Sequence, residues 1–139
     1  MRILFDTNVV LDVLLDREPH AEMAAQLLSL VDQGRIEGVL CATTVATVHY
    51  LAAKAVGVES ARRHVRELLG LFDVACVDRA SLHAALDFDL ADFEDAVLHE
   101  SARAAGVTAI VTRNGRDFAT AALPVFDPVE LLAAVLASE

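Results

Sequence analysis

Four aspartates lie next to short apolar runs that have the character of buried strands. Asp6 ends the run "RILF", Asp117 lies in the polar cluster after "TAIVT", and Asp92 and Asp95 share one face of the helix that leads into that second run. Carboxylates that converge from separate elements repel one another unless a divalent cation compensates their charge, and oxygen ligands suit Mg²⁺ or Mn²⁺. Such ions activate water and stabilise the leaving oxygen when a phosphodiester is cleaved. The pattern therefore predicts a hydrolytic metal site that needs no His or Cys.

The same aspartates also fit local structural roles, and the sequence alone leaves both interpretations open. Asp6 would cap the helix that follows it, Asp117 would begin a turn, and "DFED" is close to a capping box with Asp92 as its N-cap. Asp95 favours the chemical interpretation. It lies one turn before Leu98, beside an apolar helix face where an uncompensated carboxylate is costly.

The elements that must position these residues alternate between strand and helix patterns. Short β-branched runs separated by amphipathic helices are typical of a parallel sheet that is covered on both faces. We therefore expect one α/β domain over residues 1–139, with its functional site at the carboxyl ends of the strands. The predicted strands are 2–5, 37–42, 74–77, 108–112 and 123–126. The predicted helices are 9–15, 19–34, 43–57 (capped by Thr43 or Thr44), 59–72, 79–88, 92–106 (ending at Gly106) and 128–138.

Composition narrows the class of protein. The chain has 139 residues, 55% of them apolar, and a net charge of −10, which counts against a protein that coats duplex nucleic acid and favours a basic protein partner. It has no apolar run long enough for a membrane span and no signal-peptide pattern, so a cytoplasmic protein is expected. Cys41 and Cys76 lack metal-ligand spacing and are predicted to be buried core residues. His99 lies four residues after Asp95, yet a lone His on an apolar helix is predicted to pack in the core.

Three segments of the chain resemble the PIN domain, the fold of VapC-type toxins. They are "MRILFDTNVVLDVLLDREP", "DFEDAVLHESARAAGVTAIVTRNGRDF" and "PVFDPVELLAA", and together they extend the resemblance from residue 1 to about 134. The resemblance implies a three-layer α/β/α fold with a mostly parallel central sheet. It also implies a metal-dependent ribonuclease with an acidic cluster that binds Mg²⁺ or Mn²⁺. In that cluster Asp6, Asp95 and Asp117 match the family's acids, and Asn114 falls where many members have a further Asp.

Two positions depart from the acidic pattern of many PIN nucleases. Thr47 lies at or near the place of a helical Glu, and Asn114 is also neutral, so we expect weaker metal binding or a need for RNA phosphate to complete the metal's ligands. Asp92 is expected to compensate in part, and Asn8 to help the chain turn after the first strand. The resemblance further implies the toxin half of a type II toxin–antitoxin pair, with an RNA substrate, a basic antitoxin and a homodimer.

Several alternatives remain open at this stage. Arg113 and Arg116 flank the predicted site and either hold RNA phosphate or are solvated loop charges. The arginines of "ARRHVRELL" are more simply a charged outer helix face, and the alternative is a patch that faces RNA. A PIN module that has lost catalysis and binds RNA or protein would explain the two neutral positions. A phospho-receiver or a haloacid-dehalogenase-like phosphatase fits less well, because Lys54 is the only Lys and Asn8 stands where the phosphatase needs a second Asp.

Overall fold

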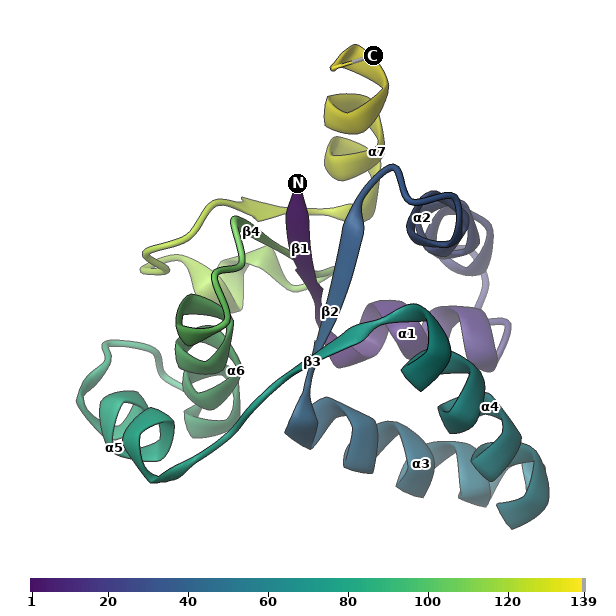
Figure 1. Ribbon diagram of the computed structural model, residues 1–139, viewed down its shortest axis with the longest axis horizontal. Helices are drawn as coiled ribbons and strands as arrows, with labels where there is room; N and C mark the ends of the chain where they lie inside the picture. Colours follow the sequence, from purple (N-terminus) through teal and green to yellow (C-terminus); the bar gives the residue numbers. More distant parts are fainter. Residues whose placement is uncertain (139) are drawn as a thin grey trace.

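A sheet of five parallel strands forms the centre of the computed structural model, which describes residues 1–138. The strands lie in the order β3-β2-β1-β4-β5, so the chain runs outward from β1 to β3 and then returns to the other side of β1 (Figure 1). Within the described residues the strands are β1 (Arg2–Phe5), β2 (Glu37–Cys41), β3 (Asp73–Ala75), β4 (Ala109–Val111) and β5 (Val125–Phe126).

Helices connect the strands and cover both faces of the sheet. In residues 1–138 they are α1 (Thr7–Leu14), α2 (Ala21–Asp32), α3 (Ala42–Val56), α4 (Val58–Leu71), α5 (Arg79–Asp87), α6 (Phe93–Ala104) and α7 (Pro128–Ala137), with a short 3-10 helix, η1 (Gly115–Phe118). Figure 1 shows α5 and α6 to the left of the strands and α1 to α4 to the right. None of the helices in this part of the chain is both long and apolar enough to cross a bilayer.

Side-chain alternation along the strands creates two separate cores. Ile3 and Phe5 of β1 pack on the face that is covered by α1, α2, α3 and α7, whereas Leu4 packs on the opposite face with Leu98 of α6. Successive residues of a strand point to opposite faces, so one buried apolar run serves both layers. The predicted α/β fold with a sheet covered on both faces is confirmed.

The strand order places a topological switch point between β1 and β4. Leu4 pairs with Val39 of β2 on one side and with Ile110 of β4 on the other. The connections from β1 leave in one direction and those from β4 in the other, and ligand sites of parallel sheets collect at such a point. The carboxyl ends of β1 and β4, which lead into Asp6 and Thr112, border this crevice.

The start and end of α6 follow from local sequence. The Asp92 carboxylate accepts a hydrogen bond of 3.0 Å from the Asp95 backbone N–H, and the chain leaves the helix at Gly106, where φ is +71°. Both predicted ends of this helix are confirmed. His99 is completely buried, as predicted: its Nε2 accepts from the Ala122 N–H at 3.0 Å.

Two local predictions were wrong. Neither Thr43 nor Thr44 caps α3, because the helix begins at Ala42 and the Thr44 hydroxyl contacts that of Thr7 at 3.0 Å instead. Cys76 is exposed rather than buried, although Cys41 is buried as predicted. The reason is that β3 is the edge strand of the sheet and ends at Ala75, so the next residue leaves the core.

Candidate active site at the carboxyl ends of β1 and β4

Asp6 lies at the centre of the switch point, and only 8% of its surface is exposed. Its backbone N–H donates to the Val111 carbonyl at 2.9 Å, which joins the ends of β1 and β4. Its Oδ1 accepts from the Thr7 N–H at 2.8 Å and caps α1, so the predicted capping role of Asp6 is confirmed. Its Oδ2 accepts from the Thr112 hydroxyl at 2.7 Å and from the Asn8 side chain at 3.2 Å. The Asp6 carboxylate is therefore held in one orientation by the start of α1 and by Thr112 after β4.

Thr112 and Asn8 extend this network to the loop after β4. Thr112 is completely buried, and its Oγ1 accepts from the Asn114 N–H at 3.0 Å while donating to Asp6. The Asn8 side-chain oxygen accepts from the Arg113 N–H at 3.3 Å. Thr112 had no predicted role, although its place directly after a buried strand and close to Asn114 is a sequence signal for a site residue.

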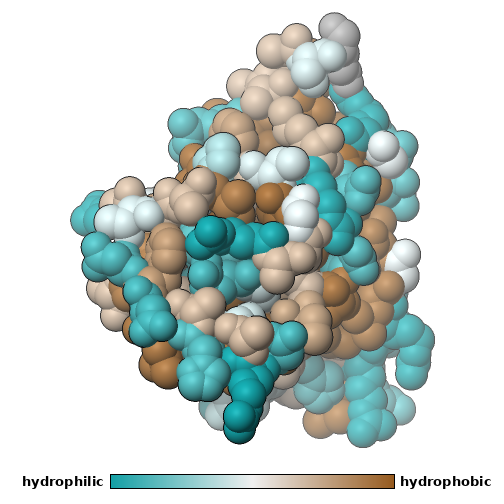
Figure 2. All heavy atoms as spheres, turned by 60° about the vertical axis from the view of Figure 1, so that its left-hand side comes forward, coloured by the Kyte–Doolittle hydropathy of each residue, from teal (hydrophilic) through white to brown (hydrophobic). Residues whose placement is uncertain are grey.

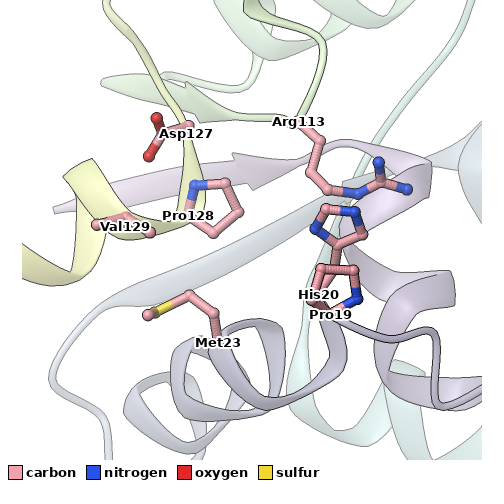
Figure 3. Close-up of a pocket in the computed structure, with 7 residues that line it drawn as sticks. All are labelled: Pro19, His20, Met23, Arg113, Asp127, Pro128 and Val129. Carbon is pink, nitrogen blue, oxygen red and sulfur yellow. The ribbon is translucent and has the colours of Figure 1, made fainter.

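Arg113 makes a partly buried ion pair with a residue 101 positions earlier in the chain. Its Nε and Nη2 donate to the two Asp12 carboxylate oxygens at 2.6 and 3.1 Å, and Asp12 on α1 is 1% exposed. Arg113 also lines a cavity of about 360 Å³ beside Pro19 and His20 (Figure 3). The ion pair gives Arg113 a structural role, because it fastens the loop after β4 to α1. RNA binding by this residue stays a prediction.

Asp95 carries the most strongly perturbed carboxyl of the site. It is half-buried in the first turn of α6, and burial together with the charges of Asp6, Asp92 and Asp117 raises its pKa to about 7. Burial is also the main cause that raises the pKa of Asp6, and hydrogen bonds from Thr112, Thr7 and Asn8 oppose it. Within residues 1–138 no side chain donates a hydrogen bond to the Asp95 carboxylate and no cation pairs with it.

Asp117 is exposed on η1, where its N–H donates to the Asn114 carbonyl at 2.9 Å. Its charge raises the pKa of both Asp6 and Asp95, so the three predicted acids lie close enough to interact. Asn114 and Arg116 line a polar cavity of about 490 Å³ next to Asp117.

Thr47 and Asp92 have other roles than the three acids Asp6, Asp95 and Asp117. The Thr47 hydroxyl forms no hydrogen bond with the described residues, whereas its neighbour Thr44 is buried against Thr7. Asp92 is used as the N-cap of α6 and adds negative charge near Asp95.

The donors of this site fit a hard divalent cation in kind, although they do not form a closed cage. Asp6, Asp95 and Asp117 supply oxygen ligands and mutually unfavourable negative charge, which a cation would relieve. In the part of the chain that the structure describes, no three His, Cys, Asp or Glu side chains are already arranged around a common metal position. Mg²⁺ usually keeps several waters, so carboxylates can hold it partly through water.

A family comparison decides what kind of domain this is. The sequence model of the PIN domain matches residues 2–116. The chain belongs to the PIN domain family. No curated protein matches the chain closely enough to add a more specific relative. The match covers β1 through the loop after β4, which includes every aspartate of the site described above except Asp117.

Several solved structures of similar shape are toxins or toxin–antitoxin complexes. VapBC2 of Rickettsia felis, solved with a promoter DNA fragment, superposes with a TM-score of 0.70 at 13% identity, over 91% of this chain and 98% of that one. A Klebsiella pneumoniae toxin–antitoxin complex gives 0.68 at 23% identity, over 91% and 97%. VapC20 of Mycobacterium tuberculosis, a toxin that cleaves the sarcin–ricin loop, gives 0.68 at 15% identity, over 85% and 94%. This PIN domain therefore has the fold of VapC toxins.

Proposed function

We propose that this PIN domain is a metal-dependent endoribonuclease and the toxin of a type II toxin–antitoxin pair. The observation that carries the proposal is the group of interacting carboxylates, Asp6, Asp95 and Asp117, at the switch point of the sheet. No basic side chain neutralises Asp95 in residues 1–138, and this is the condition under which a site gains most from a divalent cation.

In this proposal Asp6, Asp95 and Asp117 hold Mg²⁺ or Mn²⁺, directly or through water. The ion supplies an activated water and charge stabilisation for cleavage of an RNA phosphodiester. Thr112 and Asn8 fix the orientation of the Asp6 carboxylate through the hydrogen bonds described above. Asn114, next to Asp117, and Asp92, one turn before Asp95, orient water around the site.

The partner is supported by charge and by the similar structures. Several of those structures are toxin–antitoxin complexes, and a net charge of −10 favours a basic antitoxin. We also propose the cytoplasmic location that the sequence predicts, because RNA and a small antitoxin would both be present there. The homodimer that the family resemblance implies is part of the same proposal.

Cleavage of RNA by single-site variants tests the nuclease. D6N and D95N keep the size of the side chain but remove a carboxylate, and each is expected to lower RNA cleavage in Mn²⁺ by at least about 100-fold. D32N is the matched control, because Asp32 is exposed at the end of α2 and should keep full activity. If folded D6N and D95N cleaved RNA at the wild-type rate, the proposed mechanism would be wrong.

A second candidate is a PIN module that binds RNA or protein without cleaving. It is favoured by the neutral Thr47 and Asn114 and by the lack of a closed three-ligand cage in residues 1–138. Titration calorimetry with Mn²⁺ separates the two candidates. Binding at or below millimolar metal, with or without RNA, supports the nuclease, and no heat of binding under either condition supports the module.

A further inference from the structure

A groove between α3 and α4 contains two arginines and a histidine and no acidic residue. It has a volume of about 420 Å³ and is lined by His49 of α3 and by Arg62, Val65, Arg66 and Leu69 of α4. We call these five residues the α3–α4 groove. Its two arginines are exposed and one helical turn apart, so both can reach a single extended ligand.

The charge of this part of the chain is opposite to that of the rest. Helices α3 and α4 hold four of the 11 Lys and Arg residues but only two of the 21 acids, so they carry +2 while the remainder carries −12. The acidic molecule as a whole repels a polyanion. A local excess of positive charge therefore indicates a surface at which an anion can bind.

The arginines of the groove have no carboxylate partner in the described residues. Arg2, Arg103 and Arg113 are each paired with a carboxylate, whereas Lys54, Arg62 and Arg66 form no ion pair within residues 1–138. An exposed arginine without a carboxylate keeps its planar fork of donors available for phosphate.

An exposed aromatic ring lies on the same pair of helices. Tyr50 is 59% exposed, and the Lys54 ammonium lies 4.5 Å from the centre of its ring. An aromatic face beside cations is the combination by which proteins stack bases and hold the backbone of single-stranded RNA. A basic antitoxin would instead be repelled by this surface.

Helix α3 connects the groove to the acidic site. The helix begins at the carboxyl end of β2 and runs away from the sheet (Figure 1), and Thr44 in its first turn contacts Thr7 next to Asp6. His49 follows five residues later, about 8 Å further along the axis at the usual helical rise. Five residues are also about 140° around the helix axis, so a strand bound at the acidic site would pass around α3 to enter the groove.

We propose that the α3–α4 groove binds the phosphate backbone of single-stranded RNA and holds the strand next to the acidic site. This inference rests on the proposed ribonuclease function and names the surface that recognises its substrate. The groove supplies the attraction that a site made of carboxylates lacks, and it makes the binding of RNA dependent on salt.

Fluorescence anisotropy with a labelled single-stranded RNA, using the full chain in EDTA over a range of NaCl, measures binding without cleavage. For single strands, each phosphate contact contributes about 0.7 to the slope of log K against log salt. R62Q/R66Q is therefore expected to flatten the slope by about 1.4 and to weaken binding about 25-fold at 0.1 M salt. R17Q/R79Q removes the same charge elsewhere and should leave the slope unchanged.

A tyrosine variant and a competing polyanion separate RNA from an acidic protein as the occupant. Y50A should weaken RNA binding without changing the salt slope, because stacking involves no counterion release. Polyglutamate that displaces RNA as well as unlabelled RNA does would overturn the proposal in favour of an acidic protein partner. So would equal affinity and slope in R62Q/R66Q and the wild type.

The binding assay does not depend on the nuclease proposal. Loss of binding in R62Q/R66Q, in a protein that cleaves no RNA in Mn²⁺, would support the groove and remove the nuclease. Cleavage that persists while R62Q/R66Q binds like the wild type would support the nuclease and remove the groove.

Discussion

The half-buried carboxyl of Asp95 makes the stability of the metal-free protein depend on pH. Its folded pKa of about 7 lies above its unfolded value, so the folded state binds the proton more tightly. This contribution to stability is present below about pH 4 and is lost as the pH rises towards and through 7. The melting temperature of the wild type in EDTA, measured relative to that of D95N, should therefore fall over that range, so that D95N is the more stable protein at pH 8. Parallel curves for the two proteins would contradict this account of Asp95.

The Asp12–Arg113 pair acts at the scale of elements, because it joins α1 to the loop after β4. D12N leaves the guanidinium without its charged partner in a largely buried place, so we expect a loss of about 3 kcal/mol in the free energy of unfolding, measured with urea. D73N is the matched control: Asp73 pairs with Arg2 at 2.8 Å but is exposed, and its loss should cost at most about 1 kcal/mol. The double variant D12L/R113M should recover much of the loss, since apolar pairs replace buried ion pairs well. A loss in D12N no larger than that in D73N would remove the fastening role.

Elements with strong local signals were predictable from the sequence. The Asp92 cap and Gly106 fix the ends of α6 because they act through hydrogen bonds and backbone angles within a few residues. The exposure of Cys76 was not predictable, because the order of strands places β3 at the edge and no local pattern records that order.

The residues of the candidate site also divide into those that the sequence predicted and those that it did not. Asp6 and Asp117 were predicted from their places after strands and Asp95 from its place beside an apolar helix face, and the family resemblance pointed to all three. In the structure their charges interact. The partner of Arg113 was not found, because Asp12 lies 101 residues away and looks like an ordinary polar position of α1. Pairs between distant residues depend on the tertiary fold, and local sequence patterns do not record which distant residues come into contact.

At the scale of the whole molecule, charge is distributed unevenly. Figure 2, which brings the side of α5 and α6 forward, shows hydrophilic side chains interspersed with smaller hydrophobic groups. Leu82, Leu86 and Phe93 are among the exposed apolar residues of these two helices. Charge is what sets the α3–α4 groove apart, because its two helices carry +2 and the remainder of the chain carries −12.

If the acidic site binds a metal as proposed, the stability of the whole PIN domain should respond to divalent ions. A cation that binds only the folded state at 100 times its Kd adds about 2.7 kcal/mol, which for a domain of this size raises the Tm by about 10 °C. Calorimetric melting at pH 7.5 with Mn²⁺ in place of EDTA should show such a rise for the wild type and for D32N. D6N and D95N should show little of it, because each removes a ligand and part of the repulsion that the ion relieves. An equal rise in all four proteins would mean that the metal binds elsewhere on the acidic surface. The carboxylates at the switch point would then not be the metal site.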